Sequence, residues 1–176
     1  LIAKAPAPDV DPRDLLGARA TLRIETQSAP ARKVVHGIVA EAEELYENPD
    51  GMLYRVVLVP PWARASHRQR CRIFLDKTLR EIVDAVLAGD PLMKLRQGAV
   101  VDDDDGAPVY QPASEQYTWR VRDTSRLDDR RVRAYVVQYN ESDHDFVARL
   151  LEEEGISYHF ENGNETCLLV LSDGDE

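Results

Sequence analysis

The strongest constraint on the fold is a set of short segments in which apolar and polar residues alternate, separated by turn residues. The alternation is clear in residues 20–25, 117–122 and 156–161. Because successive side chains of a strand point to opposite faces, each segment predicts a strand with one buried and one solvated face. Turn sequences at residues 48–51 and 162–163 follow strand segments. The pattern predicts an α+β fold with mainly antiparallel strands.

Four further segments predict strands. Residues 33–40 are apolar and β-branched on both faces, so they predict an interior strand, with Gly37 marking a bulge or a close approach of backbone. Residues 52–59 predict a strand that the two following prolines terminate. Residues 71–75 and 132–139 predict two more strands.

Capping residues and apolar stripes indicate two helices. Thr78 followed by Glu81 forms a capping box at the start of the first helix. Ser142 is the expected N-cap of the second helix with Asp145 at its third position, and Gly155 supplies a left-handed C-terminal cap. The buried stripes are Leu79, Ile82, Val83, Val86 and Leu87 in the first helix, and Phe146, Val147, Leu150 and Leu151 in the second.

Charged residues at both ends of the second helix are expected to be exposed. His144 lies between Asp143 and Asp145 in the first turn, where polar residues are usually exposed capping groups rather than a catalytic base. Residues 152–154 are three glutamates, which predict a solvated last turn and oppose the helix dipole at a cost of roughly a few tenths of a kcal/mol.

The composition narrows the class of partner. With 22 basic and 32 acidic residues the formal net charge is −10, which argues against a general nucleic-acid or anionic-membrane binder and leaves proteins or small molecules. No segment approaches the roughly 20 apolar residues of a membrane span, and the first ten residues lack the apolar stretch of a secretory signal. Because the chain opens on Leu1 rather than Met, we expect it to be part of a longer protein.

An acidic run, Asp102 to Asp105, lies in a turn-rich segment without periodicity that predicts an exposed loop between two units. It does not fit a calcium loop. With Gly106 at the sixth position, Pro112 would take the twelfth, where a bidentate carboxylate is needed. The run is expected to be solvated, and it is either an idle insertion or a docking element.

The other residues that could bind a metal or act in catalysis are widely separated in the sequence. The four histidines, His36, His67, His144 and His159, include no pair spaced three or four residues apart. Cys71 and Cys167 are 167 − 71 = 96 positions apart, too sparse for a disulfide framework, and are expected to be reduced, half-buried thiols. Ser142 lacks a G-x-S-x-G context, and no glycine-rich phosphate loop is present. The sequence therefore predicts no catalytic, cofactor-binding or metal site, and no enzyme activity.

Residues 135–161 carry a longer motif, in which an aromatic strand ends in Val-Gln-Tyr and is followed by Glu-Ser-Asp, a phenylalanine, Arg-Leu, an acidic run with glycine, and an aromatic strand closing on Phe-Glu. The positions that carry it are Val137, Gln138, Tyr139, Glu141, Ser142, Asp143, Phe146, Arg149, Leu150, Glu152, Glu153, Glu154, Gly155, Ile156, Tyr158, Phe160 and Glu161. On these residues the chain strongly resembles the VgrG family of type VI secretion spike proteins. Residues 63–67 and the acidic run depart from the family pattern.

The resemblance implies a phage tail hub-like architecture. Residues 1–76 would form part of a β-barrel-like hub domain, residues 77–112 a connector of helix and acidic loop, and residues 113–176 a smaller strand-helix-hairpin α+β unit. The motif positions are expected mostly to specify the fold rather than to make contacts; they are Gln138, Tyr139, Glu141, Ser142, Asp143, Phe146, Leu150, Gly155, Tyr158 and Phe160.

The function implied by the resemblance is that of a structural component of the puncturing spike. It would trimerise, cap the hexameric Hcp tube, contact baseplate proteins and help deliver effectors directly or through adaptors, with no cofactor. It would assemble in the bacterial cytoplasm and be secreted by the machine itself. The alternatives are a hub of another contractile injection machine (a phage tail or an extracellular particle), an effector-bearing enzyme whose catalytic domain lies elsewhere, and a binding module unrelated to secretion.

Overall fold

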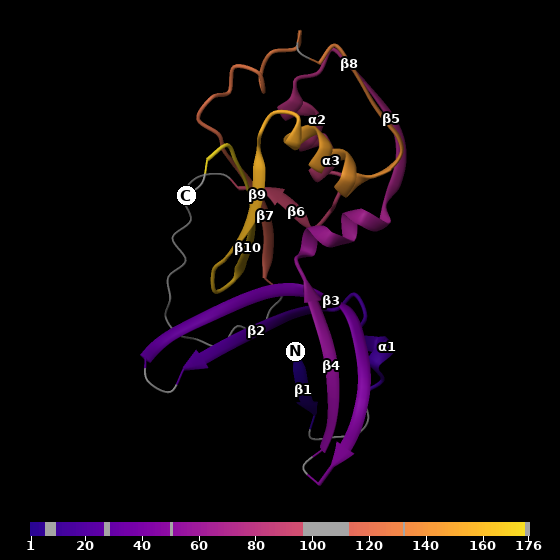
Figure 1. The fold of residues 1–176 in the computed structure, drawn as a ribbon, viewed down its shortest axis with the longest axis vertical. Coiled ribbons are helices and arrows are strands. Elements are labelled where there is room, and N and C mark those ends of the chain that lie inside the picture. Colours follow the sequence, from indigo (N-terminus) through magenta and orange to yellow (C-terminus); the bar gives the residue numbers. More distant parts are fainter. Residues whose placement is uncertain (6–9, 27–28, 50, 97–112, 132, 175–176) are drawn as a thin grey trace.

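The computed structural model describes residues 1–5, 10–26, 29–49, 51–96, 113–131 and 133–174 (Figure 1). Two parts follow one another along its longest axis. The first is a curled antiparallel sheet, and in the second two helices lie between a mixed sheet and a two-stranded ribbon. None of the helices in these ranges is long and apolar enough to cross a membrane. The acidic run at residues 102–105 falls outside them, so the expectation about it stays a prediction.

The first sheet has the strand order β1–β4–β3–β2, and all its neighbouring strands are antiparallel. The strands are β1 (Ile2–Ala5), β2 (Arg19–Thr26), β3 (Ala29–Asn48) and β4 (Gly51–Val59), and the short helix α1 (Pro12–Leu15) precedes β2. The position of β3 between two neighbours confirms the interior strand that its two-sided apolar pattern predicts. Val39, Tyr54 and Val56 form the centre of a small core on this sheet.

Gly37 allows β4 to approach β3 closely. A Cβ atom at this position would lie 2.7 Å from the carbonyl oxygen of Val59, which is closer than side chains tolerate. Of the two predicted reasons for the glycine, close packing is therefore the correct one. The irregularities of β3 against β4 fall later, after Val39 and after Glu44, and such bulges bend and twist a long strand.

The second part combines a mixed sheet with a separate ribbon. The mixed sheet has the order β6–β7–β10–β9, in which β6–β7 and β7–β10 are parallel pairs and β10–β9 is the predicted antiparallel hairpin. The ribbon pairs β5 with β8. The elements are η1 (Pro61–His67), β5 (Gln69–Leu75), α2 (Leu79–Leu87), β6 (Met93–Leu95), β7 (Ser114–Arg120), β8 (Tyr135–Ser142), α3 (Asp143–Glu152), β9 (Ser157–Asn162) and β10 (Thr166–Ser172).

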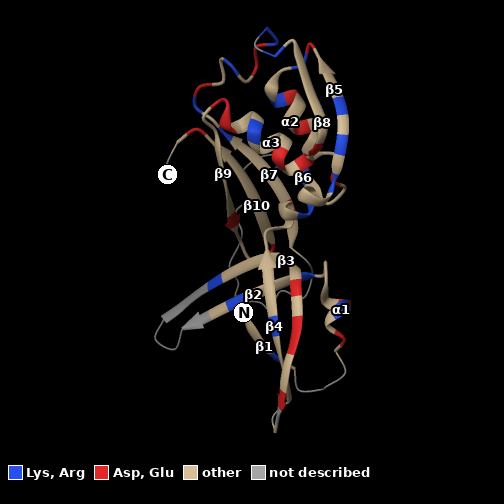
Figure 2. Cartoon of the chain, turned by 45° about the vertical axis from the view of Figure 1, so that its right-hand side comes forward, with Lys and Arg blue, Asp and Glu red and all other residues tan. Residues whose placement is uncertain are grey.

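Helices α2 and α3 fill the space between ribbon and sheet, as Figures 1 and 2 show. All nine residues of the two predicted apolar stripes are buried. The predicted caps are confirmed: the Thr78 hydroxyl and the Glu81 amide form the capping box at 3.0 Å, and Ser142 Oγ accepts from the Asp145 amide at 3.0 Å. Gly155 adopts φ +68°, the left-handed conformation expected of it. Local sequence signals therefore fix both helices.

The prediction that the charged ends of α3 are exposed is wrong at two positions. Asp143 is buried at the first turn. The Glu154 side chain is nearly buried, and Arg126 and Arg133 donate hydrogen bonds to it at 2.5 and 2.8 Å. These hydrogen bonds, Arg126 first, lower the pKa of Glu154. The arginines offset the unfavourable interaction of the acidic last turn with the helix dipole.

Candidate functional site

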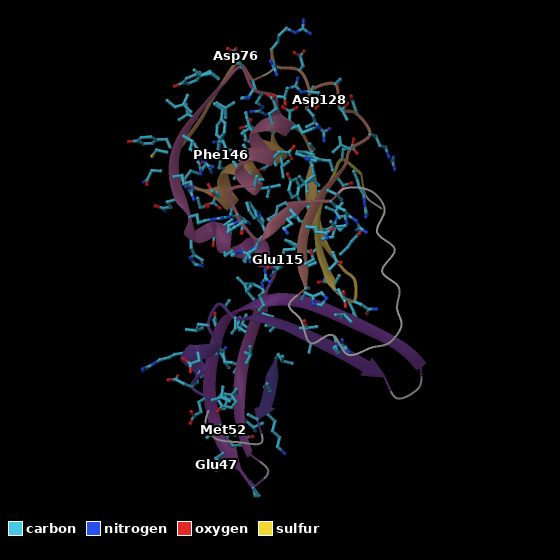
Figure 3. All side chains as sticks on the ribbon, turned by 180° about the vertical axis from the view of Figure 1, so that it is seen from behind. Glu47, Met52, Asp76, Glu115, Asp128 and Phe146 are labelled. Carbon is cyan, nitrogen blue, oxygen red and sulfur yellow. The ribbon has the colours of Figure 1, made fainter. Side chains whose placement is uncertain are left out.

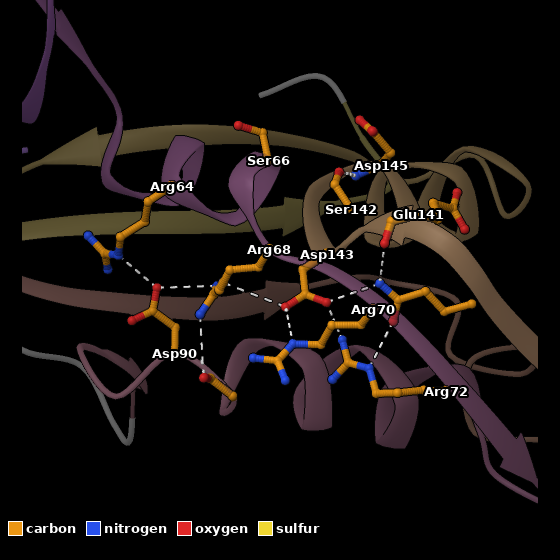
Figure 4. Close-up of polar contacts among 12 residues, drawn as sticks. Arg64, Ser66, Arg68, Arg70, Arg72, Asp90, Glu141, Ser142, Asp143 and Asp145 are labelled. Atoms are coloured by element: carbon orange, nitrogen blue, oxygen red, sulfur yellow. Dashed lines mark hydrogen bonds and ion pairs between the residues drawn. The ribbon is translucent and has the colours of Figure 1, made fainter.

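The largest cluster of buried charges is centred on Asp143, the first residue of α3, whose side chain is 1% exposed (Figure 4). Arg72 donates a hydrogen bond to Oδ1, and Gln138 Nε2 donates to the same oxygen at 3.0 Å. The Nε atoms of Arg70 and Arg68 lie 3.5 and 3.6 Å from Oδ2. Asp143 thus joins three arginines around the start of α3 to a glutamine of β8.

Gln138 is fully buried, and its side-chain amide both accepts and donates hydrogen bonds. Its Oε1 accepts from Arg72 Nε at 2.8 Å, while its Nε2 also donates to the Glu141 carbonyl oxygen at 2.9 Å. Burial is the largest influence on Arg72 and lowers the pKa of its guanidinium, against the opposing pull of Asp143. A buried amide that uses both its donor and its acceptor fixes the orientation of the residues around it.

A second centre, formed by Asp90 and Glu115, continues the cluster toward the first sheet. Arg64 Nε donates to Asp90 at 2.8 Å and its Nη2 contacts Glu115, and both carboxylates are 2% exposed. Arg68 Nη2 lies 3.4 Å from Asp90, which links this centre to Asp143. Arg19 Nε, on β2, lies 3.1 Å from Glu115. Figure 3 places Glu115 where the second part faces the first sheet, so the arginine network spans both parts.

His36 makes a second connection between the parts. Its backbone N–H donates to Asn162 Oδ1 at 2.9 Å, and its Nε2 lies 2.7 Å from the Gly163 carbonyl oxygen, in the turn between β9 and β10. Since a carbonyl can only accept, Nε2 is the protonated nitrogen. Nδ1 lies 2.9 Å from Thr21 Oγ1 on β2. The buried imidazole therefore fastens the first sheet to the β9–β10 hairpin.

Each buried carboxylate of the network is held by arginines. Asp90 and Glu115 contact Arg64, and Asp143 contacts Arg72. Among the described residues no group of three or more His, Cys, Asp or Glu side chains is placed to bind a metal ion.

A hollow of about 680 Å³ between α1 and β3 is open and lined by Val10, Asp11, Pro12, Arg13, Ala42, Glu43 and Glu44. His144 is at the surface, 3.1 Å from the Tyr158 hydroxyl.

The two cysteines differ in environment, and neither is half-buried as predicted: Cys71 is exposed and Cys167 is buried, and both are free. Burial, with a smaller contribution from Glu115, raises the pKa of the Cys167 thiol from 9.0 to about 11. At pH 8 this lowers its thiolate fraction about a hundredfold relative to an ordinary thiol. The same shift removes stability as the pH rises from 9.0 toward about 11, because the thiolate is favoured in the unfolded chain.

We therefore expect one fast and one slow thiol. Native protein mixed with a chromogenic disulfide reagent at pH 8 should release one equivalent rapidly, and Cys71→Ser should remove that phase. Cys167→Ser should leave the fast phase intact. Two fast equivalents in the wild type would contradict the buried environment of Cys167.

The arginine network is the feature that sequence reasoning missed. Arg70 and Arg72 alternate along β5, so they share a face, and Arg68 directly precedes the strand; the helix that starts at Asp143 lies 71 positions after Arg72. Three like charges so close together next to a core predict a buried acidic partner. Nothing in the local pattern says which of the 32 acidic residues that partner is.

A comparison of the whole chain decides its family. The model of the phage tail baseplate hub family matches residues 1–102 and 107–176. The chain belongs to the phage tail baseplate hub family. Two curated relatives confirm the resemblance to VgrG proteins. The type VI secretion system spike protein VgrG1a of Pseudomonas aeruginosa is 30% identical over 167 residues, which are 94% of this chain and 22% of VgrG1a. The actin cross-linking toxin VgrG1 of Vibrio cholerae is 30% identical over 162 residues, 92% of this chain and 12% of the toxin.

A solved structure shares the fold of this hub protein. The Escherichia coli c3393 protein is a component of the type VI secretion system with structural similarity to the T4 bacteriophage tail proteins gp27 and gp5. It matches with a TM-score of 0.67 at 20% identity, covering 98% of this chain and 40% of its own. The likeness confirms the predicted hub-like α+β fold.

The family-motif positions divide into buried and exposed groups in this hub chain. Gln138, Ser142, Asp143, Phe146 and Leu150 are buried, and Phe160 packs against the core. Glu141 pairs with Arg149 at 2.9 Å. Tyr139, in contrast, is 80% exposed, and Tyr158 lies at the surface with its ring edge-on to Phe160. A mostly fold-specifying role for these positions stays a prediction, and Tyr139 is the member whose environment fits it least.

Proposed function

We propose that this chain is the N-terminal part of the hub of a type VI secretion spike, which trimerises, caps a hexameric tube protein of the Hcp type and helps to deliver effectors. The observation that carries this proposal is the hub-family match over almost the whole chain, joined to 30% identity with a spike protein. Because the chain covers 22% of VgrG1a, the trimer, tube and effector roles belong to the proposal for the whole protein.

The buried polar contacts support a mechanical role. A hub that transmits force needs parts that do not move relative to one another. Arg19 reaches Glu115, and His36 reaches the β9–β10 turn, so buried polar contacts tie the first sheet to the second part. Hinging between the two parts would have to break these contacts together, and the Glu115 side chain that Arg19 reaches is 2% exposed. We therefore propose that these residues hold the hub rigid and perform no chemical step.

The proposal includes partners, location and organisation. The partners are two further copies of the hub, the tube protein, baseplate proteins and an effector or adaptor. Assembly takes place in the bacterial cytoplasm, and the machine then secretes the spike. The division into residues 1–76, 77–112 and 113–176 remains part of the proposal, and limited proteolysis within residues 97–112 tests its second boundary.

The test is the mass in solution of the protein at its full encoded length, measured by light scattering with and without purified Hcp hexamers. We expect a trimer alone and a larger complex with the tube protein, and an unrelated hexameric ring serves as the control. A full-length protein that stays a single chain and ignores the tube contradicts the proposal.

Two alternatives have observations of their own. The matching family is defined on phage tail hubs, so a hub of a phage tail or an extracellular particle is the nearest one, and the neighbouring genes distinguish it. One relative is an actin cross-linking toxin, so the full protein could carry an effector domain. Cross-linking of purified actin by the full-length protein, but not by residues 1–176, would place that activity outside this chain.

A further inference from the structure

The strand β5 has a free edge. Within the described ranges it pairs with a single strand, β8, and it runs along the periphery of the molecule in Figures 1 and 2. An unpaired strand edge presents backbone N–H and C=O groups that another strand can use. A two-stranded ribbon is also marginal by itself and gains stability from a third strand.

The outer face of the ribbon is apolar and exposed. Ile73 and Leu75 of β5 are 62% and 59% exposed, and Tyr135 of β8, directly opposite Leu75, is 64% exposed. Tyr139 continues this face along β8. Aromatic and aliphatic side chains without charge are typical of the centre of a protein–protein interface. This face would pack against the apolar side chains of an added strand.

The inner face of β5 carries a surplus of positive charge. Arg70 and Arg72 lie on this face and share one buried carboxylate, Asp143, so the formal charge of these three groups is 2 − 1 = +1; Glu141, opposite Arg70 on β8, is paired with Arg149. Arg70 is 48% exposed, and its ion pair with Asp143 is 3.5 Å long. In a chain of net charge −10, this strand face attracts anions.

We propose that the free edge of β5 binds an extended polypeptide segment of alternating apolar and acidic residues, which adds to the ribbon as a third strand. Side chains of an added strand alternate between the two faces of the sheet. Its apolar side chains would lie beside Ile73 and Leu75, and its carboxylates would lie beside Arg70 and Arg72. The backbone edge supplies the hydrogen bonds, and the two faces of β5 supply the selectivity.

Charge decides between this partner and a second copy of the chain. If two β5 edges paired with each other, their arginine faces would lie side by side, and like charges across an interface cost affinity. An acidic strand meets complementary charge instead. The proposal does not depend on the secretion function, because it concerns only the edge and the two faces of β5.

The test uses short labelled peptides on the intact chain. A peptide of alternating valine and glutamate is compared by fluorescence anisotropy with an alternating valine–lysine peptide, and with a block peptide of the same valine and glutamate composition. We expect the alternating acidic peptide to bind at least about tenfold more tightly than either control. Amide hydrogen exchange should slow on β5 when it binds.

Arg70→Glu should weaken binding of the acidic peptide about tenfold and improve binding of the lysine peptide. Arg131→Glu is the matched control, because Arg131 is 91% exposed and lies in the segment between β7 and β8. Thermal unfolding confirms that both variants are folded. Equal binding of the three peptides, an unchanged affinity in Arg70→Glu, protection on the edge strand β9 instead of β5, or self-association through β5 without peptide binding would each overturn the proposal.

Discussion

Replacing Asp143 by alanine should lower the free energy of unfolding by about 3–5 kcal/mol, because it leaves a cluster of arginines without its central carboxylate. Asp143 is 1% exposed and lies within hydrogen-bond or ion-pair distance of Arg68, Arg70 and Arg72. Gln138 would also lose an acceptor. A small domain is stable by roughly 5–15 kcal/mol, so this single change removes a large share of the total.

Equilibrium urea unfolding at neutral pH measures the effect. Asp145→Ala is the matched control, since it removes a carboxylate from the same helical turn that is 68% exposed and contacts His144. The favourable interaction with the helix dipole is lost there, about 0.3–1 kcal/mol, and the loss of the exposed contact with His144 adds little. Asp143→Asn separates charge from shape, and we expect its cost to lie between the two. If Asp143→Ala and Asp145→Ala cost the same, the network does not support the fold.

The helices and the last hairpin could be predicted from sequence because their signals are local. The capping box of Thr78 and Glu81 spans four residues, and the Asn162-Gly163 turn joins strands that are adjacent in sequence. An apolar stripe predicts burial whatever element covers it. Such signals do not depend on residues that are distant in the sequence.

The parallel pairs and the arginine network depend on distant residues. β7 pairs with β10, although β8, α3 and β9 lie between them in the sequence. The sequence of β7 does not indicate which strand it pairs with. Arg64 meets Asp90 and Glu115, 26 and 51 positions away. The chain carries many arginines and acidic residues, so charge alone leaves the pairing undetermined. Capping preferences correctly predicted that Ser142 is the N-cap of α3. The same preferences predicted an exposed Asp143, which is wrong because this end of the helix is buried.

Replacing Phe146 by alanine should cost about 3–5 kcal/mol of unfolding free energy, because the site cannot collapse around the cavity. Phe146 is fully buried, and its ring stacks on Phe74 with the centroids 5.8 Å apart and the planes at 14°. Arg149 covers it with its guanidinium carbon 5.5 Å from the ring centroid. The contact holds α3 against the ribbon, so its loss should also increase hydrogen exchange in β5 and β8.

Tyr139→Ala is the informative comparison, because both residues belong to the family motif and differ in burial. With 80% of its surface already exposed, Tyr139 should change the unfolding free energy by no more than about 0.5 kcal/mol. Denaturant unfolding of the two variants therefore tests whether the motif specifies the fold position by position. A cost above about 2 kcal/mol at Tyr139 would mean that an exposed aromatic supports the ribbon itself. An unchanged stability with lost assembly of the full-length protein would instead assign Tyr139 to a contact between proteins, on the same apolar face as Ile73 and Leu75.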